Sequence, residues 1–110
     1  MPVFITQGRF TQDAMKGMLT KPEDRAEPVR QLLEKSRCKL LGYYMTFGEY
    51  DFLIVSEGPD DTMAVPHIVA AASGAVTHLK TERALTSEEM KAAFGKAGQA
   101  TGSFHPAGTR

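Results

Sequence analysis

Apolar residues recur along this chain in two periods, which together predict four strands and three helices. Alternation of apolar and polar residues predicts a strand, whereas apolar residues three and four positions apart predict a helix. Thr11 fits the N-cap of the first helical segment. The predicted elements are a strand over 3–10, a helix over 12–37 kinked at 21–24, a hairpin over 40–57, a helix over 60–73, a strand over 75–85 and a helix over 87–96.

The hairpin is the sharpest feature of this pattern. Gly48 and Glu49, followed by Tyr50, join two segments rich in aromatic and β-branched residues. Glycine at the first central position is typical of a type II′ turn, which requires φ > 0 there. With that turn, Met45 is expected opposite Phe52, Tyr43 opposite Ile54, and Leu41 opposite Ser56.

Large apolar residues occupy both faces of the hairpin. The face opposite to Met45 and Phe52 carries Tyr44, Leu53 and Val55. An antiparallel sheet with one side in water alternates apolar and polar residues cleanly, and this one does not. Because the helices of so short a chain cover one face, we expect a second copy of the same sheet to cover the other. The hairpin therefore predicts a homodimer.

The order of elements predicts an α+β fold with ferredoxin-like topology. The order β-α-β-β-α-β followed by a helix is typical of a four-stranded antiparallel sheet with two helices on one face. Gly74 fits the residue after the second helix, and Pro66 inside that helix predicts either a kink or a delayed start. We expect one domain over residues 1–97 and a tail over 98–110, rich in small residues, that a neighbouring subunit holds.

Composition narrows the range of partners. The 110 residues carry 13 basic and 13 acidic side chains, so the formal net charge is zero. This balance argues against nucleic acids and anionic membranes and favours small molecules or proteins. A lone cysteine, Cys38, cannot form an internal disulfide, and the chain opens without a signal-peptide pattern or a membrane span. We therefore expect a reducing, cytoplasmic setting.

Candidate chemistry is concentrated on the half-polar face of the hairpin. Asp51 lies there opposite Thr46 and diagonal to Tyr44, where a carboxylate is able to accept ligand hydrogen bonds or act as a base. The alternative is that Asp51 caps backbone N–H groups of the turn. His78 in the last strand is a second candidate base, or else a solvated strand residue. These four residues form the predicted ligand site.

Metal and cofactor chemistry are not indicated by the sequence. His67, His78 and His105 lie too far apart for a metal-ligand spacing, and neither a phosphate-binding loop nor a dinucleotide fingerprint occurs. Cys38 is the single potential nucleophile, and no positioned base accompanies it. We expect a half-buried structural thiol and neither metal nor cofactor.

Several short motifs together resemble the GYD domain family. They are Thr11…Gly17, Gly48-Glu49-Tyr50-Asp51, Pro59-Asp60 and Ser73-Gly74-Ala75-Val76…Thr81, within about residues 2–92. The resemblance implies a dimeric α+β barrel, in which two ferredoxin-like sheets pack face to face, and it implies no established activity. The hairpin also resembles the effector-binding domain of Lrp/AsnC-type regulators. Because the chain lacks a helix-turn-helix segment, that second resemblance implies a ligand-binding relative without a DNA reader.

These observations favour a homodimer that binds a small, partly apolar molecule in a cleft lined by the hairpin, the first helix and the last strand. One alternative is a cofactor-independent enzyme, such as an isomerase, decarboxylase or monooxygenase, with His78 or Asp51 as base and Tyr44 as hydrogen-bond donor. Another is a structural assembly protein, which would enclose no pocket. A cavity with convergent polar side chains would separate the first two from the third.

Overall fold

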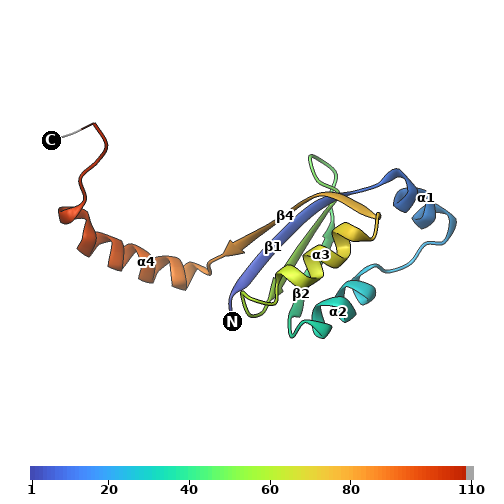
Figure 1. The fold of residues 1–110 in the computed structure, drawn as a ribbon, viewed down its shortest axis with the longest axis horizontal. Helices are drawn as coiled ribbons and strands as arrows, with labels where there is room; N and C mark the ends of the chain where they lie inside the picture. Colours follow the sequence, from blue (N-terminus) through green and yellow to red (C-terminus); the bar gives the residue numbers. More distant parts are fainter. Residues whose placement is uncertain (109–110) are drawn as a thin grey trace.

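The computed structural model describes residues 1–108 and contains a four-stranded antiparallel sheet with helices on one face (Figure 1). The elements are β1 (Val3–Phe10), α1 (Gln12–Thr20), α2 (Ala26–Lys35), β2 (Lys39–Met45), β3 (Phe52–Glu57), α3 (Ala64–Ala72), β4 (Val76–Ala84), α4 (Ser87–Ala100) and a 3-10 turn over Thr101–Ser103. The strand order β2-β3-β1-β4 confirms the predicted α+β, ferredoxin-like topology.

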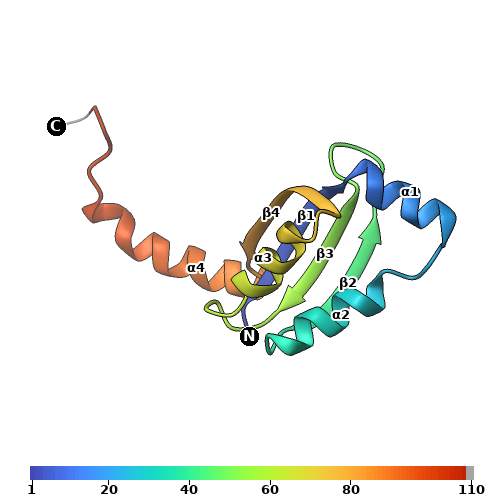
Figure 2. The same ribbon diagram turned by 45° about the vertical axis from the view of Figure 1, so that its right-hand side comes forward.

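The region expected as one long, kinked helix forms two separate helices. α1 begins where the Thr11 hydroxyl accepts a hydrogen bond from the Ala14 backbone N–H at 3.2 Å. It ends before Lys21, because the following Pro22 disfavours helical geometry in the residue that precedes it. α2 then lies along β2, whereas α1 stands at the end of the sheet (Figure 2). The prediction of one kinked helix is therefore wrong.

α3 begins later than the sequence pattern predicts, and this explains how it accommodates Pro66. Residues 60–63 form turns, and the helix starts at Ala64. Pro66 then falls in the first turn, where its missing N–H has no helical acceptor to lose. Of the two effects predicted for Pro66, the delayed start is the one that the structure shows. Gly74 follows the helix with a φ of 81°, which confirms its place just after the C-cap.

The hairpin connection differs from a tight two-residue turn. Gly48 does not have a positive φ, so the type II′ assignment is wrong. The connection is instead a loop over residues 46–51, and the Thr46 N–H donates to the Asp51 carbonyl at 2.8 Å across its base. This longer loop places no steric demand for glycine on position 48.

The register of the hairpin agrees with the prediction near the loop and departs from it further away. Met45 opposite Phe52 and Tyr43 opposite Ile54 are confirmed. A bulge at Leu41 then shifts the pairing, so that Leu40 lies opposite Ser56 in place of Leu41. Leu40 consequently packs against the core and Leu41 is exposed.

The buried core is small and divided. Phe4, Leu33, Cys38 and Met63 form one cluster, in which Cys38 is buried and not half-buried as expected. Phe52, only 3% exposed, packs elsewhere against Phe10, with ring centroids 5.0 Å apart. Its ring lies across Gly8, where a Cβ atom would come within 2.7 Å of it.

α4 is longer than predicted and leaves the body of the molecule. It begins with a capping box between Thr86 and Glu89 and runs to Ala100, through the expected domain boundary between residues 97 and 98. Figure 1 shows it pointing away from the end of β4. Within residues 1–108, none of the helices combines the length and apolar composition that a bilayer span requires.

Candidate functional site

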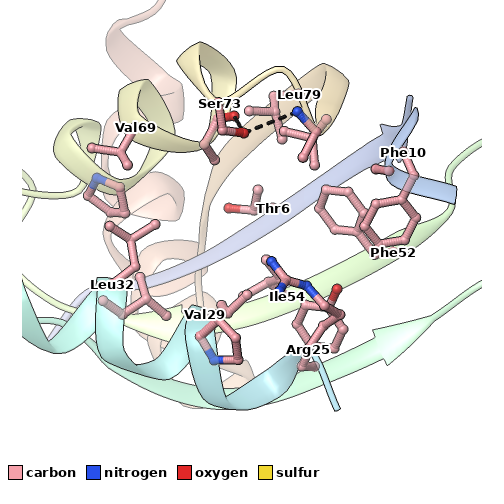
Figure 3. Close-up of a pocket in the computed structure, with 18 of the residues that line it drawn as sticks. Thr6, Phe10, Arg25, Val29, Leu32, Phe52, Ile54, Val69, Ser73 and Leu79 are labelled. Carbon is pink, nitrogen blue, oxygen red and sulfur yellow. Dashed lines mark hydrogen bonds between the residues drawn. The ribbon is translucent and has the colours of Figure 1, made fainter. Parts of the chain in front are cut away.

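A cavity of about 520 Å³ lies between the sheet and the helices α1, α2 and α3. Thr6 lies at the centre of its floor, with Phe10 and Phe52 toward one end and Leu32 and Val69 toward the other (Figure 3). Most of the remaining lining is aliphatic. A volume of this size suits a small organic molecule.

Three polar side chains meet inside this apolar cavity. Thr6 and Thr81 are paired across β1 and β4, and their hydroxyl oxygens are 3.0 Å apart. The Nδ1 atom of His67, on α3, lies 2.8 Å from the Thr81 hydroxyl. Each hydroxyl is both a donor and an acceptor, and the role of each imidazole nitrogen follows from its tautomer. Since Thr81 occupies Nδ1, the nitrogen through which His67 is able to bond a ligand is Nε2.

The local geometry of each element directs these side chains toward the cavity. Thr6 shares a face of β1 with Phe4 and Phe10 because successive strand residues alternate between faces. His67 shares a face of α3 with Met63 and Ala70, since residues three and four apart lie on one side of a helix. The cluster therefore follows from strand alternation, which turns Thr6 toward α3, and from helical spacing, which turns His67 toward the sheet.

The segment between α1 and α2 adds charged groups at the rim of the cavity. Arg25 lines the cavity (Figure 3). It forms an ion pair with Glu23, with a nitrogen-to-oxygen distance of 2.6 Å. Burial raises the pKa of the neighbouring Tyr43, an effect that the Arg25 charge opposes and the Asp24 charge reinforces. Tyr43 therefore keeps a neutral hydroxyl, able to donate or accept, throughout the physiological range.

The polar groups of the cavity are those that recognise organic oxygen and nitrogen atoms. The cluster offers one imidazole and two neutral hydroxyls, which is not a set of metal ligands. In the part of the chain that the structure describes, no three His, Cys, Asp or Glu side chains gather as a metal site.

Asp51, the leading candidate from the sequence, points elsewhere. Its Oδ2 atom accepts a hydrogen bond from the Phe10 backbone N–H at 2.9 Å. Its own N–H donates to the Gly8 carbonyl at 2.8 Å. Both partners belong to β1, so the carboxylate joins the end of the hairpin to the central strand and does not cap the turn itself.

The other predicted site residues also lie outside the cavity. Tyr44 is 60% exposed on the open face of the sheet, and Tyr43, not Tyr44, lines the cavity. The Thr46 hydroxyl donates to the Tyr50 carbonyl at 2.6 Å, beside a shallow hollow of about 390 Å³ formed by the hairpin loop. Their neighbour Asp51 faces β1, so the hairpin does not gather the three predicted side chains around one pocket.

His78 occupies a bulge in β4 and is exposed. The bulge gives it a φ of 55°, and its Nδ1 atom lies 3.1 Å from the hydroxyl of Thr77. Neither His78 nor Asp51 lines the cavity, so neither is placed to act as a base on a molecule held there.

Sequence reasoning ranked His67 below His78 and passed over the two threonines of the cluster, which look ordinary one at a time. Thr6 and Thr81 are common strand residues, and only the β1–β4 register makes them neighbours. A weak signal was present, since Thr6 interrupts a face of β1 that is otherwise formed by Phe4, Gly8 and Phe10.

Comparisons with known proteins place the chain in context. A sequence model of the family described as GYD domain matches residues 4–94. A comparison with curated proteins found no match. Among solved structures, the chain is similar to one described as the crystal structure of FFRP-DM1, with a TM-score of 0.46 and 15% sequence identity, over 77% of this chain and 100% of that chain. The family match spans the whole sheet, the three helices that cover it and the first half of α4.

Proposed function

The chain belongs to the GYD domain family, and from that premise we propose that it binds a small, mainly apolar molecule bearing one carbonyl or hydroxyl group. The site is the cavity between the sheet and helices α1, α2 and α3. The observation that carries the proposal is the Thr6–Thr81–His67 cluster in a cavity with mainly apolar walls. A polar group in apolar surroundings contributes to ligand binding only through a hydrogen bond. Such a cluster therefore favours a ligand with a matching oxygen.

The two parts of the cavity have different roles in this proposal. The apolar walls contribute affinity in proportion to the ligand surface that they remove from water. The cluster sets orientation, because His67 Nε2 meets the single oxygen of the ligand. If Thr81 donates to Nδ1, then Nε2 carries the proton and donates to a carbonyl; in the other tautomer it accepts from a hydroxyl.

This site shares some walls with the cleft expected from the sequence. Residues of α1, of β4 and of the hairpin line the cavity. The hairpin contributes through Tyr43, Phe52 and Ile54, which lie on its helix-covered face. The residues expected to bind, Asp51 and Tyr44, do not line it.

A thermal-shift experiment with matched probes tests the proposal. Aryl alkyl ketones of increasing size are compared with hydrocarbons of the same shape, and a bound ligand raises the melting temperature by mass action. We expect the ketones to give the larger shift. Thr81→Val keeps the shape of the side chain and removes the hydroxyl that orients His67 and sets its tautomer, so it should reduce the difference between ketone and hydrocarbon.

Thr77→Val on the same strand is the matched control, because Thr77 is exposed and outside the cavity. It should leave the ketone preference unchanged. If no probe raises the melting temperature, or if Thr81→Val and Thr77→Val behave alike, the proposed site is wrong.

We also propose that the binding protein is a homodimer in which two sheets pack through their open faces. This is supported by the apolar residues Ile5, Leu53 and Val55, which adjoin one another on the face that none of the helices within residues 1–108 covers (Figure 2). Tyr44, paired with Leu53, extends this surface to β2. Burial of such a surface stabilises association roughly in proportion to its apolar area.

Light scattering at micromolar concentration tests the sheet-face dimer. We expect the mass of two chains, and Leu53→Lys should shift the equilibrium toward single chains because it brings two like charges into the interface. A single-chain mass for the unmodified protein would overturn this part of the proposal without affecting the cavity.

A further inference from the structure

In the part of the chain that the structure describes, α4 is exposed along its whole length. Every residue from Leu85 to Gly108 is exposed. The molecule measures 62 × 31 × 22 Å, with a radius of gyration of 18.1 Å. A compact chain of this length has a radius of gyration of roughly 13 Å. Both ribbon views show the cause, since α4 extends well beyond the sheet (Figures 1 and 2).

The exposed helix nevertheless carries an apolar stripe. Met90, Ala93, Phe94 and Ala97 follow the spacing i, i+3, i+4, i+7, which places them on one face, and Phe94 is 71% exposed. A helix of 14 residues is marginal in water without tertiary packing. The stripe indicates that α4 packs against another surface in the assembled protein.

A second unpartnered stripe with the same spacing lies on α3. Val65, Ile68, Val69 and Ala72 also follow i, i+3, i+4, i+7, and Ile68 is 62% exposed. Val69 lies at the edge of this stripe, since it also lines the cavity. The sequence of α3 contains no charged residue, and its one strongly polar side chain, His67, bonds Thr81 on the sheet side. A helix that is apolar all round is normally buried on every side. The outer face of α3 therefore also lacks its cover.

We propose that α4 of one copy packs along the outer face of α3 of a second copy, and that the exchange is reciprocal. Two stripes of equal spacing pack by fitting the ridges of one helix into the grooves of the other. The alanines in both stripes allow the helix axes to approach closely. Because α3 has no charged side chain, the lysines and glutamates of α4 meet no like charge there.

Two-fold symmetry gives this contact sufficient size. Each α3–α4 pair covers several large apolar side chains, and an aromatic residue such as Phe94 alone buries about 150–250 Å² when covered. A two-fold axis forms the pair twice, which brings the total to the order of 1,000 Å² that a specific interface needs. The second copy thus covers both apolar stripes of the first copy, the one on α3 and the one on α4.

The junction between β4 and α4 explains why α4, the C-terminal arm of the molecule, does not reach α3 of its own chain. Only Leu85 and Thr86 separate the two elements, and the capping box holds Thr86 in an extended conformation with a ψ of 164°. The helix consequently starts at once and continues away from the sheet (Figure 1). An Arg83–Asp60 ion pair of 3.6 Å ties the end of β4 to the loop before α3.

Disulfide trapping in the full chain tests the exchange. The double variant Ile68→Cys, Phe94→Cys places one thiol on each stripe, and the native Cys38 is buried and so protected. Mild oxidation with copper phenanthroline joins facing thiols whose Cα atoms approach to about 4.4–6.8 Å. We expect a covalent two-chain species on a non-reducing gel, and circular dichroism of the reduced variant verifies that it is folded.

The control variant Ile68→Cys, Gln99→Cys moves the second thiol to the opposite face of α4 and should crosslink at least tenfold more slowly. Equal crosslinking of both variants would mean random collision and would overturn the proposal. A disulfide within one chain would mean that the arm covers its own α3, which also overturns it. Absence of crosslinking in a protein whose mass is that of a dimer would reject the arm exchange while leaving the sheet-face dimer intact.

Discussion

The carboxylate of Asp51 holds the end of the hairpin against β1 through the Phe10 N–H. Replacement by alanine leaves this part-buried N–H without its acceptor, which costs about 1–3 kcal/mol. We expect Asp51→Ala to lower the free energy of unfolding by that amount in urea denaturation. Ketone binding in the cavity should be unchanged, because Asp51 does not line it.

Asp51→Asn is the matched variant for this prediction, since an amide oxygen still accepts the bond. It should lose less stability than Asp51→Ala. The opposite result, in which either variant keeps its stability and loses the ketone shift, would mean that Asp51 is part of the binding site.

Two glycines differ in what their backbones require. Gly74 has a φ of 81°, which a β-branched residue adopts only under strain, so Gly74→Val should cost about 1–3 kcal/mol. Gly48 lacks a positive φ, and nothing lies within 4 Å of a Cβ atom built there. Gly48→Val should therefore stay within about 0.5 kcal/mol of the parent. Melting curves of both variants check this order, and its reversal would mean that the loop over 46–51 is a tight turn.

At the scale of elements, the capping box makes the start of α4 sensitive to acid. The Thr86 N–H donates to Glu89 Oε1 at 2.9 Å, and the Glu89 N–H donates to the Thr86 hydroxyl at 3.1 Å. The bonds from Thr86, its backbone N–H first, lower the pKa of Glu89. A lowered folded pKa means that the stabilisation is fully present above the unfolded value, about 4.3, and is lost as the pH falls through the folded value.

We therefore expect the helical signal in far-UV circular dichroism to fall on acidification below about pH 4. Glu89→Gln keeps a hydrogen-bonding side chain without the titrating group, so the difference between the two proteins isolates this effect. An identical acid profile for both would show that the capping box does not stabilise α4.

The motifs that resemble the family converge on one junction, the end of β1. The Thr11 N–H donates to the Ala75 carbonyl at 3.0 Å, and the Thr11 hydroxyl donates to the Gly74 carbonyl at 2.9 Å. Asp51 holds the adjacent Phe10. Residues from three separate motifs thus fix where β1 ends and α1 begins, which is an architectural role.

At the scale of the whole molecule, the core is divided because the cavity occupies the space between the helices and the sheet. Ala70 of α3 lines that space, so a larger apolar side chain there fills it at little steric cost. At about 0.8 kcal/mol per buried methylene, Ala70→Leu should raise the free energy of unfolding by about 2 kcal/mol and weaken ketone binding. Urea denaturation and thermal shift measure the two effects.

Ala71→Leu is the control for this prediction, because Ala71 is the exposed neighbour of Ala70 on the same helix. It should change neither quantity appreciably. A loss of stability in Ala70→Leu would mean that the helices close over the sheet and leave no room for a ligand.

The types and order of the elements follow from the local pattern of residues. Alternation, helical spacing and the Thr11 and Gly74 caps each act over a few neighbouring positions, so the sequence predicts them directly. The same locality explains the error in the first helical region, since the residues around Pro22 indicate an interruption but not that two separate helices result. A proline ends one helix or opens another depending on where the first turn lies.

The site, by contrast, depends on contacts between residues distant in sequence. Thr6 and Thr81 are 75 positions apart, and Phe10 and Asp51 are 41 apart. The β1–β4 register brings Thr6 and Thr81 together in the cavity. The β1–β3 pairing brings Asp51 to Phe10, where its hydrogen bond joins the hairpin to β1. Local periodicity carries no information about which strands adjoin or in what register. The chemistry of Thr6, His67 and Asp51 was therefore decided only when the sheet assembled.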